Sequence, residues 1–553
     1  MKPLFRLVFL MSIVILHSEQ AKSKQDVQAF ILPEIDIGIV GLPQKAIAKE
    51  LADGVTYFDI DRGVSSEFDN YKLVSQPLSI LKAREMKTKL AEHGQNARIE
   101  PLSEFGLYGK PLGVQVVIAP FQDSETPKEL SVQLSALGFG LTLRHSSEEG
   151  YPTTGPFKIS LLKIDLTKFN GRIESALSHD SALGVERTSS IVRRHKALAA
   201  INGGFFSWSE NVGTTGDLAG ISVVNGSLVS EAVDGRPALL IRSDVETRKL
   251  KSVEIVQDLK TRIWLTIGGK RFDVGGLNRK PGMILNCGNN HAVPTVIPVH
   301  DYVCSNDDEV VLFNDHFVHQ VPKNQLGLQF RINSDGYIQD KGEEVIGLVP
   351  NDGYLVQAIG AAAEQLGKAV QAGDPVTIHI EVFSGDQEIE IEKGLYIVNG
   401  GPTLLNDGFF DLSARGREGW ETNFGAVKIS DKFVDENDAV ASQSAETNLR
   451  EGFYHSWVVR RHPRTAVGLT EDNVLYFVVV YGRQPGVSAG ASLSDMTRLM
   501  RSLGVVDAIN LDGGGSAVMV VDGEPSGVPS DALGERFVGD AILVFDAKPE
   551  VSE

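Results

Sequence analysis

The chain has 553 residues, with 53 Lys and Arg against 72 Asp and Glu, so its formal net charge is −19. A hydrophobic content of 42% excludes an intrinsically disordered protein, and a total of 2 cysteines excludes both a disulfide scaffold and a zinc site built from four cysteines. Because binding to nucleic acid requires clustered Lys and Arg, the acidic balance also argues against a nucleic-acid-binding protein.

The first 23 residues have the pattern of a signal peptide. Lys2 and Arg6 precede an apolar run from Leu7 to Leu16, and a small-x-small sequence allows cleavage after Ser23. The run is too short to cross a bilayer, which needs about 20 apolar residues. We therefore predict an exported protein, periplasmic or extracellular, with no transmembrane segment in the mature chain.

Residues 24–63 form an N-terminal segment that ends in an alternating strand over residues 54–63. Residues 64–150 then contain two strand–helix–strand units of similar length. The first unit covers residues 71–100 and the second covers residues 114–144. Two such units predict a small split βαβ module, which resembles the sporulation-related (SPOR) repeat family. The resemblance implies that this module binds peptidoglycan glycan strands.

Residues 151–546 read as many short strands with few helices, so the predicted fold class is α+β, with a β-rich mixed-sheet domain beside the small module. Residues 244–330 are a predicted β insertion, residues 430–450 a polar surface loop and residues 547–553 a tail. Two helices are predicted, at 188–195 with Thr188 or Ser189 as cap, and around 496–503 with Ser494 as cap.

Three apolar strands run directly into a polar residue and a glycine cluster. The segments are Asn202-Gly203-Gly204-Phe205, Asn399-Gly400-Gly401 and Asp512-Gly513-Gly514-Gly515-Ser516, and Asn286-Cys287-Gly288 is a looser fourth case. A single Asn-Gly or Asp-Gly most often forms a hairpin turn, but three such strand ends favour a shared site at the rim of a sheet. None of them has the lysine of a phosphate-binding loop.

Cations and cysteines add further candidates. Arg464 and Arg483 stand at strand edges, where they could clamp an anionic group, whereas Arg460 and Arg461 are predicted to be surface arginines with solvated heads. Cys287 and Cys304 could form a disulfide or stay reduced and buried; the sequence leaves both open.

Several motifs occur in the order found in the phosphodiester glycosidase family, which residues 150–546 resemble. The segments that carry this resemblance are residues 202–206, 216–220, 236–238, 399–401, 462–466, 482–483, 512–516 and 535–543. Asp540 and His462 stand where the family more often has Asn, which leaves the choice of substrate open. The resemblance implies hydrolysis of the sugar C1–O bond in a sugar-1-phosphodiester, such as an N-acetylglucosamine-1-phosphodiester in envelope glycan or exopolysaccharide.

This chemistry requires carboxylates at the sugar and cations at the phosphate. We expect Asp512 to be the base or nucleophile, Glu535 or Asp217 to be a second carboxylate, and Arg464 and Arg483 to hold the phosphate. His455 is an acid/base, a substrate contact or a structural residue. The expected substrate-binding residues are Asn202, Gly203, Gly204, Phe205, Asn399, Gly400, Gly401, Thr465, Gly513, Gly514 and Ser516.

No cofactor is predicted. Asp217, Asp512, Asn202 and Asn399 offer oxygen ligands for a divalent cation, but no spacing resembles a calcium loop, so no metal site is assigned. Two other functions remain open: an exo-glycosidase or lyase on a polysaccharide without phosphate, and a non-catalytic envelope protein that binds peptidoglycan. The stereochemical outcome, the aglycone and the oligomeric state are open as well.

Overall fold

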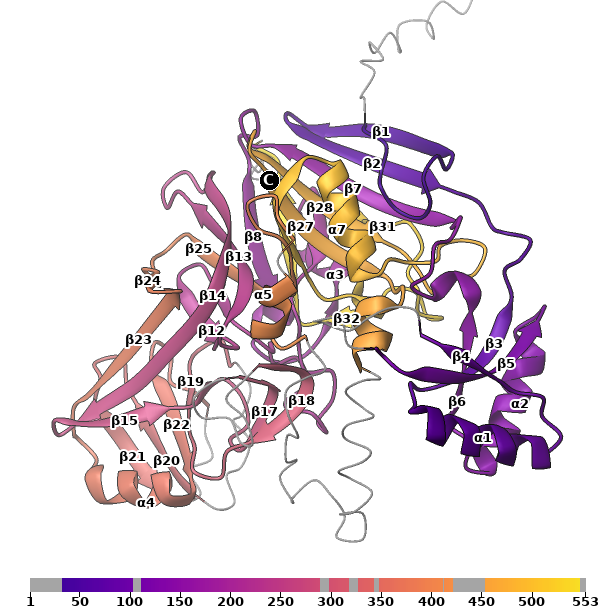
Figure 1. The fold of residues 1–553 in the computed structure, drawn as a ribbon. Coiled ribbons are helices and arrows are strands. Elements are labelled where there is room, and N and C mark those ends of the chain that lie inside the picture. Colours follow the sequence, from indigo (N-terminus) through magenta and orange to yellow (C-terminus); the bar gives the residue numbers. More distant parts are fainter. Residues whose placement is uncertain are drawn as a thin grey trace, which may run out of the picture. The chain divides into compact units, whose positions relative to one another are not determined.

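The computed structural model describes residues 32–102, 111–288, 298–317, 327–342, 348–410, 412–420 and 453–547. The predicted signal peptide, the predicted loop at 430–450 and residues 548–553 of the tail lie outside the described residues. From Glu34 onward the chain forms one compact unit (Figure 1). Within the described ranges, no helix is both long and apolar enough to cross a membrane.

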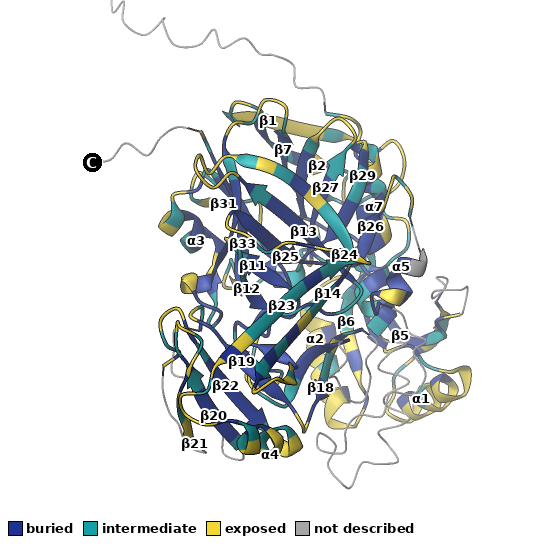
Figure 2. Ribbon diagram, turned by 90° about the vertical axis from the view of Figure 1, so that its left-hand side faces the viewer, coloured by how far each residue is buried: buried dark blue, intermediate teal, exposed yellow. Residues whose placement is uncertain are grey.

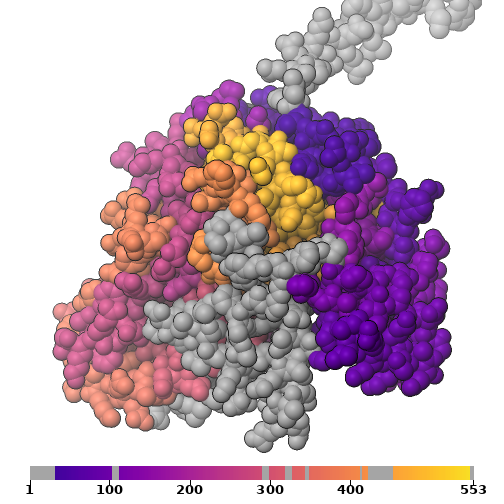
Figure 3. All heavy atoms as spheres, in the orientation of Figure 1, coloured from indigo at the N-terminus to yellow at the C-terminus, as the bar shows by residue number. Residues whose placement is uncertain are grey.

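The N-terminal module, which we define as residues 71–145, alternates strands and helices as the repeat pattern predicts. Its elements are β3 (Tyr71–Ser75), α1 (Ile80–Glu92), β4 (Arg98–Pro101), β5 (Val114–Phe121), α2 (Glu125–Ala136) and β6 (Leu141–His145). The strands form an antiparallel sheet in the order β4-β5-β3-β6, and both helices pack on it through a core that includes Leu90 and Leu134. Figure 3 shows the module as a continuous dark purple surface at one side of the view.

Two central sheets hold the strands that end in glycine clusters. One has the order β1 (Gln44–Ala52), β2 (Val55–Arg62), β7 (Phe157–Asp165), β28 (Val474–Val480), β27 (Arg464–Thr470), β29 (Val505–Asn510) and β26 (Thr403–Leu405). The other has the order β31 (Glu524–Ser526), β30 (Met519–Val521), β10 (Ala199–Asn202), β33 (Asp540–Phe545) and β8 (Arg172–Leu177).

A third sheet shares its core with these two. Its order is β12 (Ser227–Ser230), β11 (Ser222–Val224), β25 (Leu395–Asn399), β13 (Arg236–Ser243), β14 (Leu250–Ile267), β23 (Val376–Ser384) and β24 (Gln387–Glu388), with β15 (Lys270–Val274) beside β14. Ile201 of β10, Val398 of β25 and Ile509 of β29 meet in one fully buried cluster, so the three strand ends that precede glycines converge. Figure 2 shows these central strands in the dark blue of buried residues.

The described part of the predicted insertion at 244–330 is made of strands. A fourth sheet has the order β16 (Gly276–Leu277), β19 (Val310–Phe313), β22 (Tyr354–Ile359), β20 (Gly327–Ile332) and β21 (Ile338–Gly342), and α4 (Gly360–Ala369) packs against β20 and β22. A hairpin of β17 (Met283–Cys287) and β18 (Val299–Ser305) and a short pair of β9 (Glu186–Arg187) and β32 (Phe537–Val538) complete the described strands.

The remaining helical elements are short. They are α3 (Thr188–His195), α5 (Leu412–Arg417), α7 (Leu493–Ser502), the π-helix η4 (Tyr454–Val459) and the 3-10 turns η2 (Ser146–Glu148), η3 (Ser178–Asp180) and η5 (Gly514–Ser516). The N-cap residues predicted for α3 and α7 are both wrong. Helix α3 has Arg187 at its N-cap, and α7 begins two residues earlier than expected because Ser492 and Asp495 form a capping box. The β-rich α+β class is confirmed.

Candidate active site

A cavity of about 940 Å³ opens beside the ends of β27, β28 and β29 and receives side chains from the N-terminal module as well. Its volume lies near the upper end of the roughly 300–1,000 Å³ range of small-molecule sites. Charged residues dominate its lining. Five arginines face it, together with three carboxylates: Arg144, Arg460, Arg464, Arg483, Arg536, Glu148, Asp301 and Asp512. In a chain of net charge −19, this concentration of arginine marks a site for an anion.

Asp512 follows β29 and faces the cavity, as the sequence predicts. The Gly513 amide donates a hydrogen bond of 2.8 Å to its Oδ1, and the Ser516 hydroxyl bonds to the same carboxylate. Burial nevertheless raises the pKa of Asp512 to about 6. This carboxyl can therefore change its charge near neutral pH, which suits a group that exchanges protons or attacks carbon.

Asp301 is a second cavity carboxylate, and the sequence reasoning did not identify it. It lies on β18, and its backbone N–H donates to Asn286 Oδ1 at 2.9 Å. The Asp301 side chain is 41% exposed, yet desolvation by the surrounding protein and the charge of Asp512 raise its pKa to about 6. We call Asp301 and Asp512 the cavity carboxylates. The only signal in the sequence was the loose Asn286-Cys287-Gly288 motif on the paired strand.

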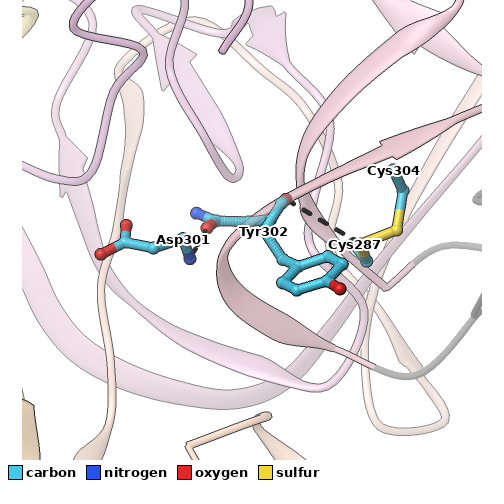
Figure 4. Close-up of a disulfide and its surroundings, with 5 residues drawn as sticks. Cys287, Asp301, Tyr302 and Cys304 are labelled. Atoms are coloured by element: carbon cyan, nitrogen blue, oxygen red, sulfur yellow. Dashed lines mark hydrogen bonds between the residues drawn. A yellow bond between two sulfur atoms is a disulfide. The ribbon is translucent and has the colours of Figure 1, made fainter. Parts of the chain in front are cut away.

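A disulfide joins the two strands of the hairpin that carries Asp301. Cys287 and Cys304 are bonded, with their Cα atoms 5.6 Å apart, which resolves the alternative left open by the sequence. Figure 4 shows Asp301 and Tyr302 on the strand that continues to Cys304. The crosslink ties the strand of Asp301 to the strand of Asn286, whose side chain also bonds to the Ala219 carbonyl at 3.1 Å. The position of Asp301 is thus fixed by covalent and hydrogen bonds together.

Arg464 and Arg483 line the same cavity. Arg464 is buried, donates to the Ala491 and Trp457 carbonyls and lies 4.6 Å from the centroid of the Trp457 ring. Arg483 is exposed to the cavity, and its guanidinium lies 3.2 Å from His462 Nδ1. Among the described residues, neither guanidinium has a carboxylate within 4.0 Å. Burial and then the charge of Arg483 lower the pKa of Arg464, so an anion bound between them would relieve an electrostatic cost.

Aromatic rings and a neutral histidine form the apolar wall. Phe205 lies 4.6 Å from His300, which packs against Trp420 and Trp457 at centroid distances of 4.3 Å and 5.0 Å. Burial and then the charge of Arg236 hold the pKa of His300 well below its ordinary value. Phe205, His300 and Trp457 line the cavity, so a sugar ring bound there would meet aromatic faces.

Asn202 and Asn399, which we call the strand-end amides, lie beneath the cavity instead of lining it. Asn202 Oδ1 accepts the Thr465 hydroxyl at 2.7 Å, and its Nδ2 donates to the Asp512 carbonyl at 2.8 Å. Asn399 Oδ1 accepts the Phe205 N–H at 2.8 Å. Both amides are buried and tie the backbone of one strand end to another. They position Phe205 and Asp512, and Thr465 takes part in the same network.

The glycines at these strand ends are required by close packing. A Cβ added to Gly203 would lie 2.3 Å from Asp540 Oδ1, and one added to Gly204 would lie 2.4 Å from Asn399 Nδ2. Gly400 and Gly401 meet the Asn510 carbonyl and Trp420 in the same way, at 2.9 Å each. Gly513 and Gly514, together with Ser516, line the cavity. Of the predicted glycines, only those after Asp512 face it.

Three predicted catalytic residues lie outside the cavity lining. Glu535 accepts a 2.7 Å hydrogen bond from the Ser189 N–H in the first turn of α3. Asp217 is buried, and desolvation, then the charge of Glu231, raise its pKa well above the ordinary value. His455 lies 4.0 Å from Glu149 with a pKa that burial lowers to about 4, so its ring is neutral at pH 7.

The prediction of solvated heads for Arg460 and Arg461 is wrong. Arg460 is 4% exposed and lies 3.3 Å from Glu148, and Arg461 is 2% exposed and lies 2.8 Å from Asp495. The acidic partners come from η2 and α7, which are distant in sequence. No group of three or more His, Cys, Asp or Glu side chains suited to a metal ion occurs within the described ranges.

Comparisons with known proteins point to one family. The phosphodiester glycosidase family matches residues 326–545. The N-acetylglucosamine-1-phosphodiester alpha-N-acetylglucosaminidase of Mus musculus is 32% identical over 105 residues, which cover 19% of this chain and 19% of that enzyme. The SPbeta prophage-derived uncharacterized protein YomE of Bacillus subtilis (strain 168) is 38% identical over 84 residues, which cover 15% of this chain and 13% of that protein. The matched segments therefore span less than a fifth of either relative.

Among solved structures, a candidate exported protein from Burkholderia pseudomallei K96243 has a TM-score of 0.82 and 29% sequence identity, over 93% of this chain and 99% of that chain. The family match is to phosphodiester glycosidases and begins at residue 326. It leaves the N-terminal module uncovered, so its likeness to the SPOR family stays a prediction. The resemblance to the phosphodiester glycosidase family is confirmed over residues 326–545, which include Arg464, Arg483 and Asp512.

Proposed function

We propose that the protein hydrolyses the C1–O bond of a sugar-1-phosphodiester. The observation that carries this proposal is one cavity in which Asp301 and Asp512, whose pKa values are both raised, accompany Arg464 and Arg483, which have no carboxylate within 4.0 Å among the described residues. Water supplies OH to C1, the bond from C1 to the bridging oxygen breaks, and the bridging oxygen leaves with the phosphate. The second proton of the water passes to the phosphomonoester or to solvent. The products are a free sugar and a phosphomonoester.

Different residues stabilise the positive and the negative charge that develop in this reaction. A carboxylate stabilises the oxocarbenium-like carbon at C1, and Arg464 and Arg483 stabilise the departing phosphate. Because phosphate is already a stable anion, the leaving group has little need of a strong general acid. Asp512 acts as base or nucleophile, and Asp301 replaces Glu535 and Asp217 as the best-placed second carboxylate.

The remaining assignments follow from the relatives. We infer an N-acetylglucosamine-1-phosphodiester as substrate because the mouse enzyme is named for that compound. The likeness to a candidate exported protein and the disulfide both favour export to an oxidising compartment, where envelope glycan or exopolysaccharide would be accessible.

The test is a screen of purified protein against aryl glycosides and sugar-1-phosphodiesters, with the release of free sugar as the readout. We expect release from the phosphodiesters. Arg464→Ala should reduce kcat/KM on phosphodiesters by about 10-fold or more, which corresponds to one charge-assisted hydrogen bond. Arg501→Ala, which removes an exposed arginine on α7, is the matched control and should leave activity unchanged.

Equal losses on aryl glycosides and phosphodiesters in Arg464→Ala would contradict a phosphate-binding role and favour an ordinary glycosidase. Binding to glycan without any release of sugar would favour the non-catalytic alternative.

A further inference from the structure

A second cavity, of about 320 Å³, lies where the N-terminal module meets the π-helix η4. Strands β3, β5 and β6 contribute Ser75, Gln115 and Thr142 to its lining, and η4 contributes His455. Arg144, Ser456 and Arg460 line both this cavity and the catalytic cavity. The two spaces therefore share one wall, and we call the second cavity the module groove.

Hydrogen bonds and ion pairs hold the shared wall in place. The Arg461 N–H donates to the Glu148 carbonyl at 2.8 Å, and its guanidinium donates to the Tyr151 carbonyl at 2.8 Å. Arg460 lies 3.3 Å from Glu148 and 3.8 Å from Glu149, and Lys72 of β3 lies 3.6 Å from Glu149. These bonds fix the segment that follows β6 against the segment that follows η4, so the groove has a defined shape.

The chemistry of the groove favours an anionic group that also bears hydroxyls. Its described lining includes the cations Arg144 and Arg460 and no Asp or Glu. Arg144 donates only to the Leu143 carbonyl, at 3.3 Å, and has no carboxylate within 4.0 Å among the described residues. Thr142 is exposed and supplies a hydroxyl group beside it. The Gln115 amide already donates to the Ser75 carbonyl at 2.9 Å, and the Ser75 hydroxyl donates to the Gln76 carbonyl at 2.7 Å.

We propose that the module groove binds the aglycone of the substrate, and that this aglycone is a further sugar-phosphate unit, whose phosphate Arg144 holds. The proposal rests on the proposed function, because it requires a phosphodiester to be cleaved in the catalytic cavity. The preferred substrate is then an oligomer or polymer of sugar-1-phosphate units, and the N-terminal module is part of the substrate-binding site.

The experiment compares two probes with methyl caps, a one-unit and a two-unit oligomer of 6-linked N-acetylglucosamine-1-phosphate. We expect kcat/KM of the wild-type protein to be about 10-fold or more higher for the two-unit probe, because that probe gains a charge-assisted contact. Thr142→Trp, which fills the groove from an exposed position, and Arg144→Ala should each bring this ratio close to one. Arg84→Ala, which removes an exposed arginine on α1, should preserve it.

The outcomes separate the two proposals. If the wild-type protein cleaves neither probe, this result contradicts both the proposed function and the proposed role of the groove. If the wild-type protein cleaves both probes with equal kcat/KM, only the proposed role of the groove is overturned. The same conclusion follows if both Thr142→Trp and Arg144→Ala keep the wild-type ratio of kcat/KM between the two probes. Thermal unfolding of each variant checks folding, and Thr142→Trp keeps the test valid should Arg144→Ala prove unstable.

Discussion

The strand-end amides, Asn202 and Asn399, and the cavity carboxylates, Asp301 and Asp512, are polar residues at or near strand ends around the same core. The amides are buried, and each bonds to the backbone of a segment that follows another strand. The carboxylates face open space and have pKa values raised to about 6. The first pair holds the sheets together, and the second pair has the exposure and charge that chemistry needs. A polar residue at a strand end is thus structural where protein covers it, and it belongs to the candidate site where it borders the cavity.

The largest expected effect is at Asp512. Asp512→Asn should lower kcat on a sugar-1-phosphodiester by about 10²–10⁴-fold, the range of acid–base and related carboxylate roles. The melting temperature at pH 8 should not fall, because the amide replaces a carboxylate whose charged form is disfavoured by burial.

The matched control for this substitution is Asp540→Asn. Asp540 is buried and its pKa is likewise raised by burial, to about 7, but it accepts the Gly204 N–H at 2.9 Å and does not line the cavity. We expect near-normal turnover. Normal turnover in Asp512→Asn would show that Asp512, like Asp540, has only a structural role.

At Asn202 we expect substitution to reduce stability much more than turnover. Asn202→Ala leaves the Thr465 hydroxyl and the Val518 N–H without their acceptor, and the free energy of unfolding should fall by about 2–4 kcal/mol. The kcat of the protein that remains folded should change much less than in Asp512→Asn. Denaturant unfolding and active-site-normalised kinetics would measure the two effects. A loss of kcat without a loss of stability would place Asn202 with the carboxylates.

The pH dependence of kcat should report on Asp512 and its coupling to Asp301. Since Asp512 must lose its proton to act as base or nucleophile, kcat should rise as the pH increases through about 6. The charge of Asp512 raises the pKa of Asp301, and the coupling is reciprocal. Asp301→Asn should therefore move this limb of the kcat profile to lower pH. A limb that stays in place would show that the two groups do not interact.

The smallest effect is expected at Glu535. Its carboxylate accepts the Ser189 N–H at the start of α3, so Glu535→Gln should cost about 1 kcal/mol of stability, as the loss of a charged cap does. Turnover should stay near normal, which steady-state kinetics would check. A large fall in kcat would instead support the catalytic assignment that the sequence favoured.

Regular alternation and glycine placement were enough to predict the β-rich class, β2, and the strands and helices of the N-terminal module. In the candidate site, the positions of Asp512, Arg464 and Arg483 at strand ends were enough to predict that these residues share one cavity. Their roles stay predictions. Asp301 was not predictable, because it lies within a strand and becomes a cavity residue only through the pairing of β18 with β17. Arg460 and Arg461 were misjudged because their acidic partners are distant in sequence.

The bond between Cys287 and Cys304 closes a 17-residue separation around the hairpin of Asp301. A loop of this size stabilises a fold by about 3 kcal/mol in the chain-entropy account. A newly synthesised chain in a thiol-rich cytoplasm lacks this bond, so we expect one wall of its cavity to be loosely held. Oxidation would then complete the site, so the reduced chain should lack the proposed activity.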